Sequence, residues 1–270
     1  MTEEKGFVYV GGHRLAYTRM GTGSPVVVLE AGAGTPRGTW NKIMPAIAEF
    51  TQVVSYDRAS VGESDPGPRG RTCRELVDDL SQLLHTLQLS SPYVLVGNSL
   101  GGHIIRYFSY QHPGEVAGII LLDSVHHDQI RQAFALMPHP LPTDSSDLST
   151  LRRNLTNIMN GMISEPDQDP EGLDYRAMDE QVRKTGSLGN MPLVVITAGS
   201  QAGADLPPDY RQAYRRMFRD LQVELSRLST RGKHMFVERS GHFIQEDEPA
   251  LVVDTVRQMV DLTRQDVSPV

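Results

Sequence analysis

Short apolar runs recur along the chain, with amphipathic stretches between them. The runs lie at residues 25–29, 53–56, 93–96, 116–122, 192–197 and 235–238. A short apolar run bounded by turn-forming residues predicts a buried strand. The sequence therefore predicts at least six buried strands.

Between the predicted strands, apolar residues recur at helical spacing. The clearest case follows Thr72, which forms a capping box with Glu75 ahead of leucines at 76, 80, 83, 84 and 87. Further helices are expected at 40–50, 103–110, 209–228 and 249–262. Residues 7–19 instead predict a hairpin with a glycine turn. Because strands alternate with helices, we predict an α/β fold with a mostly parallel central sheet flanked by helices.

The pattern changes between residues 128 and 188. Strand-like runs disappear there, and proline, methionine and acidic residues replace them. The segment holds ten acidic and six basic residues, and its methionines at 137, 159, 162 and 178 suit an adaptable apolar wall. We predict an α/β core of residues 1–127 and 189–270, with a helical lid of residues 128–188 over the carboxyl ends of the strands.

Charge and composition narrow the choice of partners. The 270 residues hold 26 lysines and arginines against 33 aspartates and glutamates, a net charge of -7. This charge argues against nucleic acid or an anionic membrane as the main partner. No apolar run approaches the roughly 18 residues of a membrane span, and the N-terminus lacks a signal-peptide pattern, so we expect a cytoplasmic protein.

Cysteine and histidine spacing gives no sign of a metal site or a disulfide. The single cysteine, Cys73, falls in a predicted helix and has no partner within the chain. The histidines and this cysteine do not follow the spacing of zinc ligands. We therefore expect no metal and no other cofactor.

A candidate nucleophile lies between a predicted strand and a predicted helix, in the sequence Gly-Asn-Ser-Leu-Gly at 97–101. A side chain on so sharp a turn points out of the sheet, and the two glycines leave room for the close backbone approach. The helix that follows directs its free N–H groups and its positive end toward this position. Ser99 is therefore placed to act as a nucleophile next to an oxyanion site.

A serine nucleophile needs a base, and the base needs an orienting carboxylate. Among nine histidines His242 is the best candidate, because it lies on the loop between the last strand and the last helix. Asp123 and Asp205 both follow strands in the expected order. We favour Asp123, which ends its strand directly and would be held rigidly, whereas the loop before Asp205 is longer and looser.

Three further motifs are Tyr-Asp-Arg-Ala at 56–59, Gly-x-Ser at 62–64 and Pro249 after Ser-Gly-His. Together with the motifs above, they resemble the α/β-hydrolase superfamily along the whole chain. The resemblance implies the α/β-hydrolase fold and a Ser-His-Asp triad. It also implies that the backbone N–H groups of Ala33 and Leu100 form the oxyanion hole. At 31–34 this chain has Ala-Gly-Ala-Gly where the family usually has His-Gly, which keeps the backbone donor and loses the side chain.

A narrower resemblance concerns the substrate. Leu-Asp-Ser at 122–124, His-His-Asp at 126–128 and the segment 240–249 look like the subgroup that contains the macrolide esterases, which act on tylosin-type lactones. Asn98 replaces the commoner histidine before the nucleophile, a variant that occurs in carbon–carbon bond hydrolases and in many esterases. Neither feature fixes the substrate.

The residues favour a cofactor-free serine hydrolase that cleaves a small-molecule carboxylic ester or lactone through an acyl-enzyme. Two alternatives stay open: a carbon–carbon bond hydrolase with the same triad, and a receptor of this fold that binds a small molecule with little turnover. A dehalogenase or an epoxide hydrolase would need aspartate in place of Ser99. Asp57 and Arg58 are expected to fix their own loop through local hydrogen bonds and an ion pair. The oligomeric state stays open.

Overall fold

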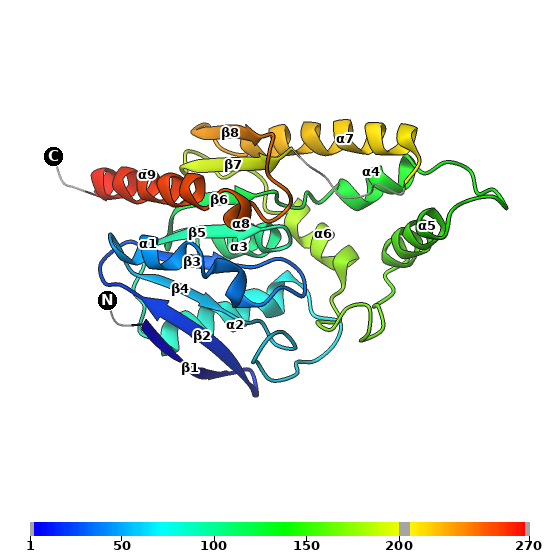
Figure 1. Ribbon diagram of the computed structural model, residues 1–270. Coiled ribbons are helices and arrows are strands. Elements are labelled where there is room, and N and C mark those ends of the chain that lie inside the picture. Colours follow the sequence, from blue (N-terminus) through cyan, green and yellow to red (C-terminus); the bar gives the residue numbers. More distant parts are fainter. Residues whose placement is uncertain (1–2, 200–205, 268–270) are drawn as a thin grey trace.

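The computed structural model describes residues 3–199 and 206–267. In these residues one sheet has the strand order β1-β2-β4-β3-β5-β6-β7-β8 (Figure 1). The strands are β1 (Glu3–Val10), β2 (His13–Met20), β3 (Val26–Glu30), β4 (Val53–Tyr56), β5 (Tyr93–Asn98), β6 (Val116–Leu122), β7 (Leu193–Ala198) and β8 (Gly232–Val237). β1 and β2 form the predicted hairpin, β2 also pairs antiparallel with β4, and the pairs from β4 to β8 are parallel. The predicted mostly parallel sheet is confirmed.

Helices cover both faces of this sheet. The helices are η1 (Arg37–Trp40), α1 (Met44–Ala48), α2 (Cys73–Thr86), α3 (Gly101–Gln111), α4 (Gln129–Ala135), α5 (Ser146–Met159), α6 (Tyr175–Arg183), α7 (Pro208–Ser226), α8 (Ile244–Asp247) and α9 (Pro249–Val267). Successive residues of β5 point to opposite faces: Leu95 packs in the cluster that includes α2 and α3, and Val96 in the cluster that includes α1 and α9. No helix in the described ranges is long and apolar enough to cross a membrane.

The predicted helix at 40–50 is split in two. The 3-10 turn η1 ends at Trp40, and α1 begins only at Met44 with Pro45 in its first turn. Proline lacks an N–H and fits the first turn of a helix but not its interior. The proline therefore starts a new, short helix at this point.

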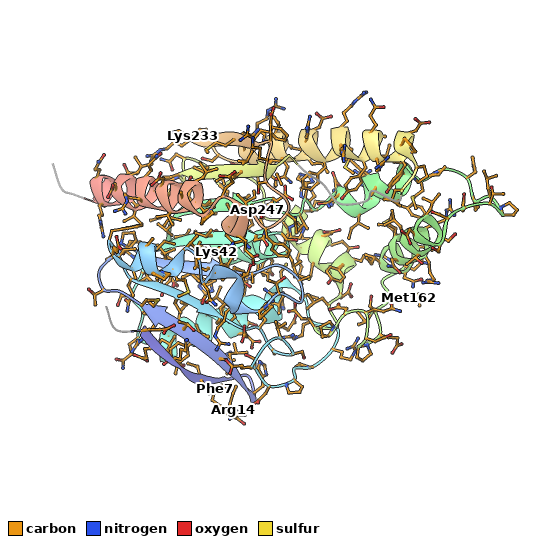
Figure 2. All side chains as sticks on the ribbon, in the orientation of Figure 1. Phe7, Arg14, Lys42, Met162, Lys233 and Asp247 are labelled. Atoms are coloured by element: carbon orange, nitrogen blue, oxygen red, sulfur yellow. The ribbon has the colours of Figure 1, made fainter. Side chains whose placement is uncertain are left out.

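The segment 128–188 contains α4, α5 and α6 (Figure 1). α4 and α5 pack against α7 in a separate apolar cluster that includes Ala133 and Leu155. α6 instead contributes the fully buried Met178 and Val182 to the core on the face of the sheet that α2 and α3 cover. Met162 is exposed at the edge of the molecule (Figure 2). The lid boundaries at 128 and 188 stay a prediction.

Candidate active site

Ser99 occupies the sharp turn between β5 and α3. Its backbone has φ +53°, an unfavourable region for a residue with a side chain. The turn is held on both sides, because the Ser99 N–H donates to the Leu122 carbonyl (3.0 Å) and the Ser99 carbonyl accepts from the Val125 N–H (3.1 Å). A strained backbone that neighbouring bonds enforce is common at functional sites.

Two glycines allow the surrounding backbone to approach this turn. A Cβ atom on Gly101 would lie 2.2 Å from the Glu30 carbonyl oxygen, so the first turn of α3 packs directly on the end of β3. A Cβ atom on Gly32 would lie 3.2 Å from the Ser99 Cβ. The loop after β3 therefore runs beside the Ser99 side chain, as an oxyanion loop would have to.

Asp123 and His242 meet at the carboxyl ends of β6 and β8. The Asp123 Oδ2 lies 2.7 Å from the His242 Nδ1, and its Oδ1 accepts the Ala198 N–H at 2.9 Å. The Asp123 side chain is 4% exposed, whereas that of His242 is 46% exposed. The buried carboxylate can hold the imidazole in one orientation while the other ring edge stays accessible. Asp205, the alternative acid, lies outside the described residues.

The loop that carries His242 is fixed by two further side chains. The Asn98 Nδ2 donates to the His242 carbonyl (3.0 Å) and to the Leu122 carbonyl (3.0 Å). On the other side, Asp247 accepts the Gly241 N–H at 2.7 Å. Asn98 therefore ties the residue before the nucleophile to the loop of the base, a positioning contact that its place in the sequence motif did not reveal.

Ser99, Asp123 and His242 line one cavity of about 620 Å³. The hydrogen bonds found among the described residues do not include one between the Ser99 hydroxyl and His242. Such a bond commonly tightens only when substrate binds. The rest of the wall comes mainly from apolar side chains of α4, α5 and α7, including Ile130, Ala133, Leu151, Leu155 and Phe218. The methionines at 137, 159, 162 and 178, expected to form such a wall, do not line this cavity.

Two backbone donors are available near Ser99. Within the described parts of the chain, no hydrogen bond uses the N–H of Ala33 or the N–H of Leu100. Leu100 directly precedes the first residue of α3, so its N–H belongs to the positive end of that helix. Both groups predicted as oxyanion donors therefore remain free to bind a substrate oxygen.

A buried ion network holds the loop that carries Ala33. The Arg58 guanidinium donates to the carbonyls of Ala31 (2.7 Å) and Gly32 (2.6 Å). It also pairs with Glu30 and Glu171, each at 2.7 Å, and all three charged side chains are nearly inaccessible to solvent. Arg58 thus links β3 to a residue more than a hundred positions later in the chain.

Glu171 completes the network from the predicted lid segment. Its Oε1 accepts the Gly34 N–H at 2.7 Å, one residue after the candidate oxyanion donor. Burial raises the pKa of Glu171, but the charge and hydrogen bonds of Arg58 outweigh burial and leave that pKa below its usual value. Glu171 is therefore held as an anion that fixes the turn at Ala33 and Gly34.

Removing this anion should displace the oxyanion loop. We expect Glu171→Gln to lower kcat for an ester by about 10- to 100-fold with little change in KM, because a displaced donor acts mainly on the transition state. The variant should also lose about 3 kcal/mol of unfolding free energy, since Arg58 loses a buried partner. Steady-state kinetics and urea unfolding measure the two effects.

The control for this variant is Asp65→Asn, which breaks the exposed ion pair between Arg14 and Asp65. It should change both quantities little, because water screens an exposed ion pair. A Glu171→Gln enzyme that loses stability but keeps its kcat would reduce Glu171 to a purely structural residue.

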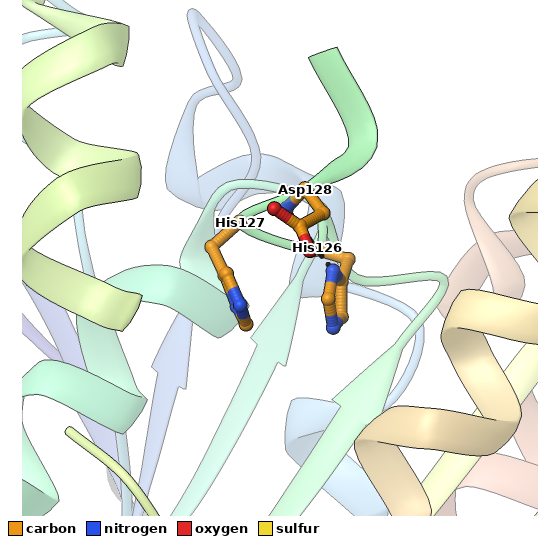
Figure 3. Close-up of side chains that lie close together, drawn as sticks. All are labelled: His126, His127 and Asp128. Carbon is orange, nitrogen blue, oxygen red and sulfur yellow. Dashed lines mark hydrogen bonds between the residues drawn. The ribbon is translucent and has the colours of Figure 1, made fainter. Parts of the chain in front are cut away.

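A second group of polar side chains lies on the loop after β6. One ligand atom each of His126, His127 and Asp128 lies within 4.8 Å of the others (Figure 3). Groups of this kind could in principle hold a metal ion. The two imidazole rings stack with centroids 4.2 Å apart.

The surroundings of this group oppose a cation. The His126 Nδ1 already accepts the Asp128 N–H at 3.1 Å. The Asp128 carboxylate is paired with Arg183 (2.7 Å) and Arg131 (3.1 Å). A metal ion would have to displace these bonds next to two positive charges. The existing bonds and the two arginines therefore disfavour a metal ion at this group.

The buried histidine should make stability depend on pH. Burial, with smaller effects of His127 and Arg106, lowers the pKa of His126 to about 3. The unfolded chain binds this proton near pH 6.5, so the folded state should lose about 2 kcal/mol from His126 between pH 7 and pH 5. His126→Asn keeps an acceptor for the Asp128 N–H and removes the titration. Between pH 7 and pH 5 the variant should therefore lose about 2 kcal/mol less unfolding free energy than the wild type, and urea unfolding at both pH values measures the difference. Equal losses in the two proteins would contradict the low pKa of His126.

Comparison with known proteins identifies relatives along most of the chain. The model of the Alpha/beta hydrolase family matches residues 26–255. The uncharacterized protein YqjL of Bacillus subtilis (strain 168) is 26% identical over 234 residues, which cover 87% of this chain and 83% of YqjL.

Solved structures resemble this fold over nearly its whole length. A thermophilic esterase from Thermogutta terrifontis superposes with a TM-score of 0.67 at 19% identity, covering 97% of this chain and 99% of the esterase. Haloalkane dehalogenase DbeA from Bradyrhizobium elkani USDA94 superposes with a TM-score of 0.67 at 17% identity, covering 98% of this chain and 100% of the dehalogenase. Because an esterase and a dehalogenase share the architecture, only the residues of the site can indicate the reaction.

Proposed function

The chain belongs to the Alpha/beta hydrolase family, and from this premise we propose that it is a serine hydrolase that cleaves a small-molecule carboxylic ester or lactone through an acyl-enzyme. The observation that supports this most is the 2.7 Å contact between Asp123 and His242 in the cavity that Ser99 also lines. A carboxylate, an imidazole and a hydroxyl in this order are what acyl transfer to serine requires.

Each group has one role in the proposed reaction. His242 Nε2 takes the Ser99 proton as Oγ attacks the ester carbonyl, and the N–H groups of Ala33 and Leu100 bind the oxyanion. The Asp123 carboxylate accepts a hydrogen bond from the His242 Nδ1–H, which fixes the tautomer and stabilises the imidazolium. His242 then gives its proton to the leaving alcohol, and water cleaves the acyl-enzyme by the same steps, which returns Ser99 and releases the acid.

The residue at position 99 supports this choice among the reactions of the family. The dehalogenase and epoxide hydrolase branches use aspartate as the nucleophile, whereas this chain has serine on the turn. Ester or lactone hydrolysis is the reaction that serine, the neighbouring imidazole and two free backbone donors support best. The narrower resemblance to macrolide esterases stays a prediction about the substrate.

The predicted lid would contribute to substrate choice. α4 and α5 supply Ile130, Ala133, Leu151 and Leu155 to the cavity wall. These four side chains are apolar, so an apolar acyl or alcohol group suits this part of the wall. A cavity of this size fits a substrate considerably larger than a simple acetate ester.

Covalent labelling tests the proposal. A fluorophosphonate should modify the protein once, and mass spectrometry of the digest should place the adduct on Ser99. The same preparation should hydrolyse 4-nitrophenyl butyrate and release butyrate in equal amount with 4-nitrophenol. An unlabelled Ser99, or a label on another residue, would reject the proposed function.

A further inference from the structure

Arginines crowd one stretch of α7. Four of them lie within nine residues, at positions 211, 215, 216 and 219. Among the described residues, the ion pairs found involve none of these four arginines, although the helices next to α7 pair Arg131 with Asp128 and Arg152 with Asp144. Like charges one helical turn apart destabilise a helix by about 0.2–0.5 kcal/mol per pair. The chain has a net charge of -7, yet this part of α7 carries four arginines against the two flanking aspartates, Asp209 and Asp220, which is a local excess of positive charge.

Two of these arginines reach the active-site cavity. Arg211 is half-buried and Arg215 is exposed, and both line the cavity that Ser99 and His242 also line. Both also line an adjoining hollow of about 510 Å³ on the outer side of α7, to which Arg216 and Arg219 contribute. Arg219 stacks on Phe236, 4.4 Å from the ring centroid. Arg211 and Arg215 thus form the boundary between the catalytic cavity and a positively charged outer surface.

Arg211 and Arg215 are charged, whereas most of the cavity wall is apolar, and this difference indicates which substrate group they would bind. In that wall, the Tyr214 hydroxyl is already bonded to Gln129 at 2.9 Å. The guanidinium of the half-buried Arg211 is less screened beside this wall than it would be in water, and the planar donors of both arginines match a carboxylate in a two-bond geometry. Among the described residues no ion pair engages Arg211 or Arg215, so an anionic group of a substrate would find both guanidinium groups unpaired there.

We propose that the substrate is an ester that carries a carboxylate, and that Arg211 and Arg215 bind this carboxylate while the ester group lies at Ser99. The inference rests on the proposed function, because it names the class of ester that the same site would take. The carboxylate can belong to the acyl part or to the alcohol part of the ester. In either case the two arginines would bind the carboxylate in the same way.

Two matched substrate pairs test the proposal. Mono-4-nitrophenyl glutarate and its methyl ester differ only by a carboxylate on the acyl part, and 4-(butyryloxy)benzoate and its methyl ester differ only by one on the alcohol part. In at least one pair the wild-type enzyme should prefer the anionic ester in kcat/KM by about 10-fold or more. Arg211→Gln with Arg215→Gln should remove that preference, measured as the ratio of kcat/KM for the anionic ester to kcat/KM for its neutral partner.

Arg216→Gln is the matched control, because Arg216 lies on the same helix and lines only the outer hollow. It should change the preference by less than about two-fold. The amide of the preferred pair gives a readout that needs no turnover: this is 4-(butyramido)benzoate for the alcohol part and glutaric acid mono-4-nitroanilide for the acyl part. Calorimetry should detect binding of that amide to the wild type and a loss of about 10-fold or more in the double variant.

The outcomes separate this proposal from the proposed function. A wild-type enzyme that is labelled at Ser99 but prefers the neutral ester in both pairs would overturn the anionic-substrate proposal alone. Equal preferences in the wild type and the double variant would do the same. Failure of the fluorophosphonate to label Ser99 would reject the serine-hydrolase assignment, while binding of the amide would still decide whether the two arginines recognise a carboxylate.

Discussion

Replacing Ser99 with alanine should abolish ester hydrolysis and leave the protein folded. The Ser99 hydroxyl would carry the covalent step, and alanine supplies no nucleophile, so kcat should fall by at least about 10³-fold. The bonds that hold the turn use the Ser99 backbone, which the substitution retains. Thermal unfolding should therefore change little, and kinetics with 4-nitrophenyl butyrate would measure the loss.

Ser109→Ala provides the control. Ser109 is buried on α3, the helix that follows the nucleophile, and its hydroxyl donates to the Ile105 carbonyl within that helix. This variant should keep kcat within about two-fold of the wild type. If Ser99→Ala kept near-wild-type activity that a fluorophosphonate still inhibited, the nucleophile would be another residue.

The elements around the nucleophile could be predicted because their signals are local. The strand before Ser99, the glycines beside it and the apolar run of β6 are each encoded within a few neighbouring residues. β4, predicted from its apolar run alone, has the expected bounds Val53–Tyr56. The capping box of Thr72 and Glu75 is likewise local, and both of its hydrogen bonds are present.

Contacts between distant segments could not be predicted in the same way. Asp57 and Arg58 were expected to act within their own loop, and that expectation was incomplete. Asp57 also accepts the Arg37 N–H at 2.6 Å, and Arg58 pairs with Glu30 and Glu171. Nothing near Glu171 in the sequence distinguishes it from the other acidic residues of an acidic, proline-rich stretch, because its partners become neighbours only when the chain folds.

The same reason applies to Asn98 and to the arginines of α7. The motif around Ser99 identifies Asn98 only as a departure from the commoner histidine, whereas its bond to the His242 carbonyl requires the loop after β8 to be in place. Arg211 and Arg215 are typical of a solvated helix face in the sequence. Their role as candidate binding residues depends on the cavity, which forms from elements far apart in the chain.

Asp123→Asn should be the most informative change at the site after Ser99→Ala. The asparagine Oδ1 can still accept the Ala198 N–H, which Asp123 Oδ1 accepts at 2.9 Å, so the end of β6 should keep its conformation. The amide nitrogen would then face the His242 Nδ1 in place of the carboxylate that lies 2.7 Å away. A donor at that position forces the imidazole proton onto Nε2, the nitrogen that has to accept the proton of Ser99.

The expected loss in kcat is about 10⁴-fold, the size of the effect when a triad imidazole is held in the wrong tautomer. Circular dichroism and urea unfolding should show a folded protein, and labelling of Ser99 by a fluorophosphonate should slow in parallel with turnover, because both reactions need the same base. Asp205→Asn is the comparison, since Asp205 is the other aspartate that follows a strand in the expected order. It should cost less than about 10-fold. If Asp205→Asn caused the large loss and Asp123→Asn the small one, the orienting carboxylate would belong to the loop after β7, and the contact between Asp123 and His242 would be a structural one.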